Sequence, residues 1–216
     1  MRILLINQFY KPDTAATGQL LADVAEELAA HGHEVHVICG RTMYDGGRLQ
    51  APREQVVNGI HIHRVAGTSF GRHRLIGRTM DYLSFYMTAA RRALKLPRPD
   101  VCVSLTTPPL ISLVGLMLSK LKGTQSVIWV MDVYPDVAVA YDVLQEKSLF
   151  YRVLARVNRV IFRNAAAVIS LSEVMTERLQ SLGALPEKLH TVHNWVPGET
   201  VGQLDGKTVG QYDPSH

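Results

Sequence analysis

A pair of carboxylates flanks a tyrosine directly after one buried apolar run of the sequence. Asp132 follows the apolar residues VIWVM, and Tyr134 and Asp136 come within the next four positions. In an open α/β sheet, ligands bind beyond the carboxyl ends of the strands. A carboxylate at that place can orient a substrate hydroxyl or accept its proton, so Asp132 is the candidate catalytic group. The alternative is an aspartate that only caps the following turn.

A loop of small residues near the N-terminus is a second candidate. The loop includes the segment TAATG, residues 14–18, and it opens an apolar stretch with helical spacing. A helix N-terminus presents unpaired N–H groups and a partial positive charge, which favour a phosphate or another anion. The dinucleotide fingerprint G-x-G-x-x-G is absent, and one glycine is weak evidence. An ordinary strand-to-helix turn capped by Thr17 is the alternative.

Two further polar segments end apolar runs. Thr106 and Thr107 precede a pair of prolines, where a structural turn is the competing interpretation. Asn194 lies in the segment HNW after the last apolar run. The neighbouring His193 could form a hydrogen bond in the wall of a site as easily as it could act as a catalyst. We take Thr106, Thr107 and Asn194 as candidate binding residues.

Several common chemistries are disfavoured by what the sequence lacks. The other histidines near strand edges, including His36, His61 and His63, have no metal-ligand spacing, so no metal is expected. There is also no G-x-x-x-x-G-K-[ST] loop of a P-loop nucleotidase.

The elements that must position these residues alternate between strand-like and helix-like patterns. Continuous apolar runs are typical of strands buried on both faces, and alternation with helices implies a parallel sheet. We therefore predict an α/β fold, a Rossmann-like doubly wound parallel sheet of about seven strands. The domain would span residues 1–196, with 197–216 a linker or disordered tail. The predicted strands are 2–9, 34–40, 60–67, 100–109, 125–132, 166–172 and 188–195.

Composition places the chain among ordinary globular proteins. Hydrophobic residues make up 47% of the 216 and charged residues 19%, which is enough apolar material for a core. The two cysteines, Cys39 and Cys102, lie in apolar runs and predict buried reduced thiols in a cytoplasmic protein. The sequence offers neither a secretion signal nor an apolar segment long enough to cross a bilayer.

Basic residues are concentrated in one segment. Between residues 70 and 98 seven arginines and lysines face a single acid, Asp81, although the whole chain is only +4. A solvated helix face around a core stripe is the first interpretation, and contact with an anionic membrane leaflet is the second. Nucleic acid is disfavoured because no recognised binding motif accompanies the charge. The seven are Arg72, Arg74, Arg78, Arg91, Arg92, Lys95 and Arg98.

Taken together, the motifs resemble a known family. The opening MRILLINQFYKPDTAATGQLLADVAEELAAHGHEVHVICG looks like the start of a family 4 glycosyltransferase of the GT-B fold. The segments DYLSFY, LTTPPL, VMDVYPDVAVA, AAAVISLS and VHNWVP follow in the same order. They are most similar to the bacterial O-antigen and capsule group, the fucosamine-transferase-like branch. The resemblance covers residues 1–197.

The resemblance implies an activity and assigns roles. The domain would be the N-terminal, acceptor-side half of a retaining transferase that moves a sugar from a nucleotide sugar to a lipid-linked saccharide in surface polysaccharide synthesis. No cofactor or bound metal is implied. By position, backbone amides of Thr17 and Gly18 would meet the donor diphosphate. Many relatives have a histidine where this chain has Met131 and Asp132. The acceptor side would be lined by Thr106, Thr107, Tyr134, Asp136 and Asn194.

The sequence departs from the family in one large respect. The C-terminal half, with its E-x7-E nucleotide-binding segment, does not follow within these residues. We therefore expect a chain that needs a C-terminal GT-B partner domain and is inactive alone. Two alternatives remain open: a non-catalytic acceptor-binding or scaffold subunit of a split transferase, and a fragment of a GT-B-like nucleotide-sugar epimerase. A peripheral position at the inner face of the membrane would suit a lipid-linked acceptor.

Overall fold

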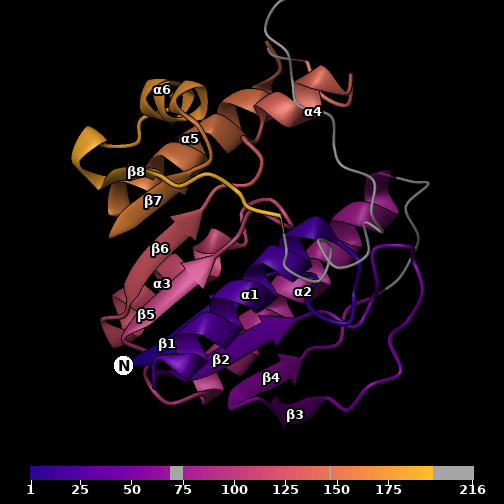
Figure 1. Ribbon diagram of the computed structural model, residues 1–216. Helices are drawn as coiled ribbons and strands as arrows, with labels where there is room; N and C mark the ends of the chain where they lie inside the picture. Colours follow the sequence, from indigo (N-terminus) through magenta and orange to yellow (C-terminus); the bar gives the residue numbers. More distant parts are fainter. Residues whose placement is uncertain (69–74, 146, 197–216) are drawn as a thin grey trace, which may run out of the picture.

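The computed structural model describes residues 1–68, 75–145 and 147–196 (Figure 1). Apolar runs form the strands, and segments with helical spacing form the helices, as the sequence predicts. The strands are β1 (Arg2–Ile6), β2 (Glu34–Cys39), β3 (Glu54–Val57), β4 (Ile60–Arg64), β5 (Val101–Ser104), β6 (Gln125–Trp129), β7 (Ala167–Ser170) and β8 (Leu189–Thr191). The helices are α1 (Ala16–Ala30), α2 (Leu75–Lys95), α3 (Ser112–Lys122), α4 (Asp136–Ala140), α5 (Leu149–Asn164) and α6 (Glu173–Ser181).

The strands form one sheet in the order β3-β4-β2-β1-β5-β6-β7-β8. All pairs are parallel except β3 with β4. The chain order reverses at β1, since Ile3 pairs with Val35 of β2 on one side and with Val101 of β5 on the other. The Rossmann-like prediction is thus confirmed, and the reversal defines a topological switch point where ligands characteristically bind.

An eighth strand was not foreseen. β3 pairs antiparallel with β4 through a two-residue turn, Asn58 and Gly59, whose φ angles of 51° and 79° are both left-handed. Asn-Gly between apolar residues, as in VVNGIH, is a strong hairpin signal because these residue types tolerate positive φ. The expected number of strands was therefore one short, and the extra strand protects the edge beside β4.

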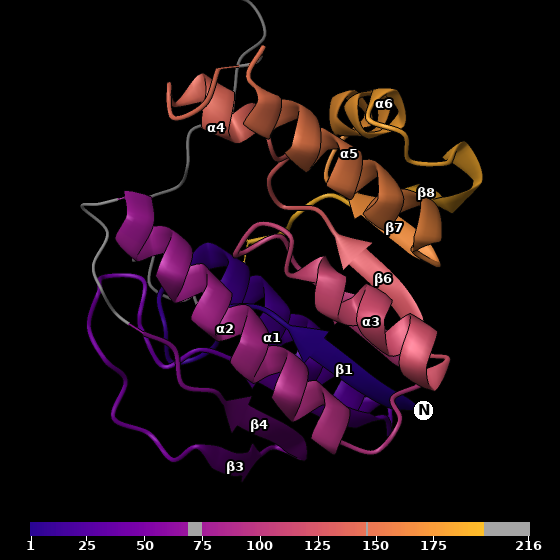
Figure 2. The ribbon, with the colours of Figure 1, turned by 180° about the vertical axis from the view of Figure 1, so that it is seen from behind.

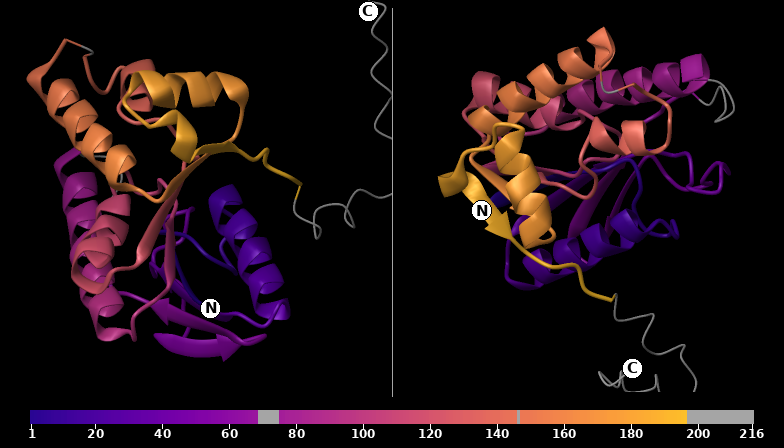
Figure 3. Two further views of the ribbon diagram at one scale, coloured as in Figure 1. Left: turned by 90° about the vertical axis from the view of Figure 1, so that its left-hand side faces the viewer. Right: turned by 90° about the horizontal axis from the view of Figure 1, so that it is seen from above.

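Helices cover both faces of the sheet. The left panel of Figure 3 shows α1 on one side and α2, α3 and α5 on the other, the side seen in Figure 2. Separate apolar clusters lie beneath α1, beneath α2 and α3, and beneath α5. Cys39 and Cys102 are buried and free as predicted, and burial raises the pKa of each thiol to about 12. No helix in the described residues is both long enough and apolar enough to span a bilayer.

The end of the described chain differs in detail from expectation. The last strand is only Leu189–Thr191, preceded by a short 3-10 turn at Pro186–Lys188. Beyond it, Trp195 stacks on Trp129 with ring centres 5.8 Å apart and donates its indole N–H to Asp23 of α1 at 2.9 Å. The chain therefore returns across the sheet to α1. The predicted tail, 197–216, lies outside the described residues.

Candidate functional site

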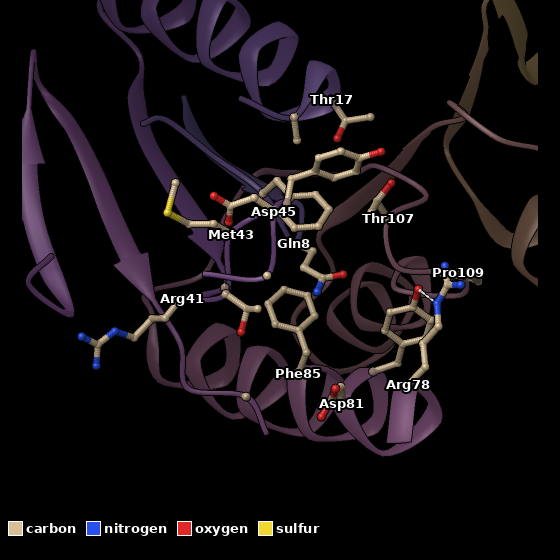
Figure 4. Close-up of a pocket in the computed structure, with 18 of the residues that line it drawn as sticks. Gln8, Thr17, Arg41, Met43, Asp45, Arg78, Asp81, Phe85, Thr107 and Pro109 are labelled. Carbon is tan, nitrogen blue, oxygen red and sulfur yellow. Dashed lines mark hydrogen bonds between the residues drawn. The ribbon is translucent and has the colours of Figure 1, made fainter. Parts of the chain in front are cut away.

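A cavity of about 880 Å³ opens beyond the carboxyl ends of β1, β2 and β5, at the switch point (Figure 4). Its walls come from the loop after β1, the loop after β2, the first half of α2 and the turns after β5 and β6. Polar lining side chains include Gln8, Thr17, Thr107, Asp132 and Tyr134. The position is the one that the fold predicts for a ligand.

Backbone and amide hydrogen bonds fix the floor of this cavity. The buried Asn7 donates from Nδ2 to the Phe9 carbonyl at 2.8 Å and to Thr17 Oγ1 at 3.4 Å. The Gln8 amide donates to the Thr107 carbonyl at 2.9 Å, and the Gly40 amide donates to the Gln8 carbonyl at 2.8 Å. These bonds join the ends of β1, β2 and β5. Sequence reasoning gave Asn7 no role, although a polar amide directly after a buried strand was the available signal.

The N-terminus of α1 faces the cavity without a side-chain cap. Ala15 is the cap residue, and its amide donates to Asp13 Oδ1 at 2.9 Å. Helix geometry leaves the amides of Ala16 and Thr17 without an intrahelical acceptor, and both residues line the cavity. The alternative that Thr17 caps the helix is wrong, since Thr17 lies inside it.

Gly18 occupies a different environment from Thr17. It is buried and does not line the cavity, and its amide donates to the Ala15 carbonyl at 2.9 Å. A Cβ at this position would lie 3.1 Å from backbone atoms of Phe9 and Tyr10. Glycine therefore allows close packing of the helix on the loop, and a larger residue would need the loop to shift by a few tenths of an ångström. The predicted contact of Gly18 with a diphosphate does not agree with this placement.

Thr106 holds the turn that carries Asp132. Its Oγ1 accepts the backbone N–H groups of Met131 and Asp132, each at 3.0 Å. Asp132 lines the cavity and is exposed to solvent there, and desolvation by the surrounding walls raises the pKa of its carboxyl group above the ordinary value. Thr106 is thus a positioning residue for Asp132 as well as part of the wall. A carboxylate held this way can accept a hydrogen bond from a ligand hydroxyl.

Side chains from α2 complete the wall opposite α1. Arg78 donates from Nε to the Tyr82 hydroxyl at 2.7 Å, and Phe85 follows one turn later (Figure 4). The Tyr86 hydroxyl donates to the Pro109 carbonyl, which ties α2 to the turn after β5. From the sequence, Arg78 was counted only as a basic residue. Its spacing with Tyr82 and Phe85, four and then three residues, was the signal that they share one helix face.

Two predicted acceptor residues lie outside the cavity wall. Asp136 accepts from Arg178 Nε at 2.6 Å and Nη2 at 3.0 Å, and from the Tyr151 hydroxyl at 3.2 Å. It therefore ties α4 to α5 and α6. Asn194 is exposed in the segment after β8. Their positions do not agree with the predicted acceptor contact.

The histidines near the sheet edge form a polar cluster away from the cavity. His36 Nδ1 lies 2.9 Å from His63 Nε2, and Arg92 Nη2 lies 2.9 Å from His63 Nδ1. Burial lowers the pKa of His63 to about 4, so the ring is neutral at pH 7. Across the described ranges, no group of three or more His, Cys, Asp or Glu side chains is arranged to hold a metal ion. The expectation of metal-free chemistry stays a prediction.

Comparison with protein families gives a match over most of the chain. The model described as "Glycosyl transferase 4-like domain" matches residues 16–195. Among curated proteins, a "Probable glycosyltransferase WbjE" from Pseudomonas aeruginosa is 26% identical over 125 residues, which cover 57% of this chain and 31% of that protein.

Solved structures share the fold at low sequence identity. Sucrose-phosphate synthase from Thermosynechococcus elongatus has a TM-score of 0.67 at 16% identity, covering 89% of this chain and 48% of that one. Anabaena HepE in complex with UDP and glucose has a TM-score of 0.55 at 17% identity, covering 91% and 45%. The catalytic domain of starch synthase IV from Arabidopsis thaliana, bound to ADP and acarbose, has a TM-score of 0.61 at 12% identity, covering 93% and 52%.

Proposed function

The chain belongs to the glycosyl transferase 4-like domain family, and from this premise we propose that its cavity receives the saccharide acceptor in a transfer from a nucleotide sugar. The observation that carries the proposal is the cavity at the switch point, with Asp132 on one wall and the uncapped N-terminus of α1 on another. HepE, which shares this fold, was solved in complex with UDP and glucose, and this supports a nucleotide sugar as donor.

The α1 N-terminus would contact the donor diphosphate. The amides of Ala16 and Thr17 point out of the first helical turn, and the helix dipole adds a partial positive charge there. Fixed donors of this kind stabilise the negative charge that grows on the leaving diphosphate in the transition state. Ala16 replaces Gly18 in this assignment, because the Gly18 amide is already bonded to Ala15.

The wall around Asp132 would hold the acceptor. In the transfer, an acceptor hydroxyl oxygen forms a bond to the sugar carbon as the bond from that carbon to the diphosphate oxygen breaks, and the hydroxyl proton passes to the departing diphosphate. The Asp132 carboxylate accepts the hydrogen bond of that hydroxyl and orients its oxygen, and Thr107 offers a second polar contact. The aromatic rings of Tyr134 and Tyr82 provide apolar surface for the sugar ring.

The finer assignments rest on the resemblance of the motifs alone. We propose retention of anomeric configuration, no bound metal or other cofactor, and an acceptor that is a lipid-linked saccharide of a surface polysaccharide. The fucosamine-transferase-like branch would fit an N-acetylated or deoxy-amino hexose.

The chain spans about a third of the curated relative and about half of the solved relatives that it matches. Because GT-B enzymes close their active site between two halves, we propose that transfer requires a second domain supplied with this one. The chain alone would bind saccharide and turn over slowly or not at all. Measurable transfer by the purified 216-residue chain without a partner would contradict this part of the proposal.

A binding experiment with a matched pair of variants tests the acceptor site. Calorimetry with a panel of hexoses and disaccharides would compare Asp132→Asn with Asp136→Asn, two identical chemical changes inside and outside the cavity. Loss of a charged hydrogen bond costs about 1.5–3 kcal/mol, so we expect binding to weaken roughly 10- to 100-fold for Asp132→Asn only. Equal affinities for the two variants would contradict the role of Asp132.

A further inference from the structure

A second groove lies between the hairpin of β3 and β4 and the C-terminal half of α2, at the edge of the sheet (Figure 2). Its volume is about 320 Å³, and no residue lines both this groove and the cavity at the switch point. The helix α2 forms a wall of each. Tyr82 and Phe85 face the cavity, and Thr88 is the first residue of the helix that lines the groove.

Five cationic residues and one carboxylate line the groove. The cations come from two sides, since Arg53 lies just before β3 and Arg91 lies on α2. Glu54 is the one carboxylate among these described lining residues, and Arg92 pairs with it at 2.8 Å. The groove therefore keeps an excess of positive charge. The five cationic residues are Arg53, Arg64, Arg91, Arg92 and Lys95.

Two of these cations have partners within the protein. Arg64 is buried and donates from Nη2 to the Lys11 carbonyl at 3.0 Å, which holds the loop after β1. Arg92 donates from Nη2 to His63 Nδ1 at 2.9 Å in addition to its pairing with Glu54. Burial, and then the charge of Arg92, lower the pKa of His63 to about 4. The ring of His63 therefore stays neutral at pH 7 and leaves the charge of the groove unchanged.

The other three cations are exposed and, among the residues that the structure describes, their side chains have no hydrogen-bond or ion-pair partner: Arg53, Arg91 and Lys95. Arg91 and Lys95 are four residues apart on α2, a spacing at which like charges destabilise a helix. A helix C-terminus attracts cations, but Lys122 already serves this end of α2, because its Nζ donates to the Leu94 carbonyl at 2.8 Å. Folding alone therefore gives no reason for three free cations at one groove, whereas a bound anion does.

We propose that this groove binds a small phosphate monoester. Guanidinium and ammonium groups donate charged hydrogen bonds to phosphate oxygens, and the planar fork of arginine matches two of these oxygens at once. A phosphate dianion would offset the repulsion between Arg91 and Lys95, and Arg53 would add a donor from the hairpin side. The volume of about 320 Å³ leaves room for a short organic group beside the phosphate.

Thr88 indicates that this organic group carries a hydroxyl. Thr88 lies three residues before Arg91, so both are on one side of α2. The Thr88 hydroxyl donates its hydrogen to the Ser84 carbonyl at 2.9 Å. Its oxygen can then accept a hydrogen bond from a ligand hydroxyl. A polyol or sugar phosphate should therefore bind more tightly than inorganic phosphate.

The groove accounts for only part of the basic segment that the sequence singled out. Arg78 lines the cavity instead, and Arg98 donates to the Gly123 carbonyl at 3.2 Å. Arg72 and Arg74 lie outside the described residues. A count of charge along the sequence treats these positions alike, whereas the structure assigns them to different surroundings.

Calorimetry of the full chain tests the groove with glycerol phosphate, and with inorganic phosphate, glycerol and sodium chloride at one ionic strength. We expect one saturable site for the two phosphates and none for glycerol or chloride. Loss of a charged hydrogen bond weakens binding roughly 10- to 100-fold, and we expect this loss for Arg91→Gln and for Lys95→Gln. Arg156→Gln is the matched control, an exposed arginine on α5 outside the groove, and should change the affinity less than about twofold because salt screens distant charges.

Two further measurements separate binding from a structural role. Glu54→Gln removes the carboxylate of the groove and should strengthen phosphate binding by about two- to fivefold. Without phosphate, Arg91→Gln and Lys95→Gln should melt at the wild-type temperature or above it, because each removes a like-charge contact. If these cations served only the stability of the fold, both variants would melt at a lower temperature.

Three outcomes would overturn the proposal. One is the absence of saturable binding for both phosphates. Another is binding that Arg91→Gln leaves unchanged, as expected for a phosphate at the N-terminus of α1. The third is an equal loss in Arg91→Gln and Arg156→Gln, which would mean attraction to net charge alone. Sugar transfer does not enter these measurements, so this proposal and the proposed function can fail independently.

Discussion

Replacing Thr106 by valine isolates the bond that positions Asp132. Valine keeps the size of threonine but removes Oγ1, which accepts the N–H groups of Met131 and Asp132 at 3.0 Å each. The Met131 N–H is partly buried, and a buried donor without a partner costs about 1–3 kcal/mol. The Asp132 N–H is exposed, so water replaces its lost partner at a smaller cost. We expect Thr106→Val to lower the free energy of unfolding by about 1–2 kcal/mol.

Thr106→Ser is the matched control because it keeps the oxygen and removes only a half-buried methyl group. That methyl contributes about 0.4 kcal/mol, half the value of a fully buried one. Urea unfolding would compare the three proteins, with the slope against denaturant unchanged. The melting temperature of Thr106→Val should fall by about 2–8 °C. Thr106→Val should also weaken saccharide binding, since the Asp132 turn loses its anchor, whereas Thr106→Ser should retain it.

The reasoning would be refuted if Thr106→Val unfolded at the same urea concentration as the wild type. It would also be refuted if serine were the more damaging of the two changes. Either result would mean that water or a small backbone shift satisfies the two N–H groups as well as Oγ1 does.

Three further predictions concern other contacts. Gly18→Ala places a methyl group 3.1 Å from the backbone of Phe9 and should cost about 1–3 kcal/mol by overpacking, measured by thermal unfolding, whereas unchanged stability would show that the loop yields freely. Arg178→Ala removes both hydrogen bonds to Asp136, and because this pair is exposed we expect the free energy of unfolding to fall by about 1 kcal/mol or less, with a smaller effect in high salt. Saccharide affinity should not change, and a large drop in that affinity would place Asp136 in the acceptor site. Burial lowers the pKa of His63 to about 4, so the unfolded chain binds the proton first and the free energy of unfolding should fall as the pH drops from about 7 to about 4. His63→Gln should flatten that part of the profile of stability against pH, and an unchanged slope would mean that other groups cause it.

The fold could be predicted from the sequence because its elements are repeated and strongly patterned. Short continuous apolar runs are typical of strands covered on both faces, and their alternation with helices leaves few topologies. The strand β3 was not predicted because its residues, Glu54–Val57, are mostly exposed and have no buried apolar pattern. The Asn58-Gly59 pair in the sequence indicates a hairpin turn, and it is the only local signal of β3.

The site could be predicted in part. Thr17, Thr106, Thr107, Asp132 and Tyr134 lie around one cavity because the carboxyl ends of parallel strands meet at one edge. The direction of a side chain a few residues beyond a strand depends on partners that are distant in sequence, which no local pattern reveals.

Asp136 and Gly18 illustrate this limit. Asp136 turns away from the cavity because Arg178, 42 residues later in the chain, lies within hydrogen-bond distance. Gly18 was assigned to the diphosphate by its position in the loop of the family that the chain resembles, but its surroundings depend on how closely the helix packs on the loop after β1. In the sequence, Arg78 was only counted among the basic residues, although its helical spacing with Tyr82 places both on the cavity side of α2.

Chemical-shift mapping by NMR tests the central claim most directly. The isotope-labelled chain would be titrated first with a nucleotide sugar such as UDP-glucose and then with a saccharide acceptor. Our account predicts that the nucleotide sugar shifts the amides of Ala16 and Thr17, and that the saccharide shifts those of Thr107 and Asp132. Saturable shifts elsewhere on the chain, with these four amides unmoved, would contradict it.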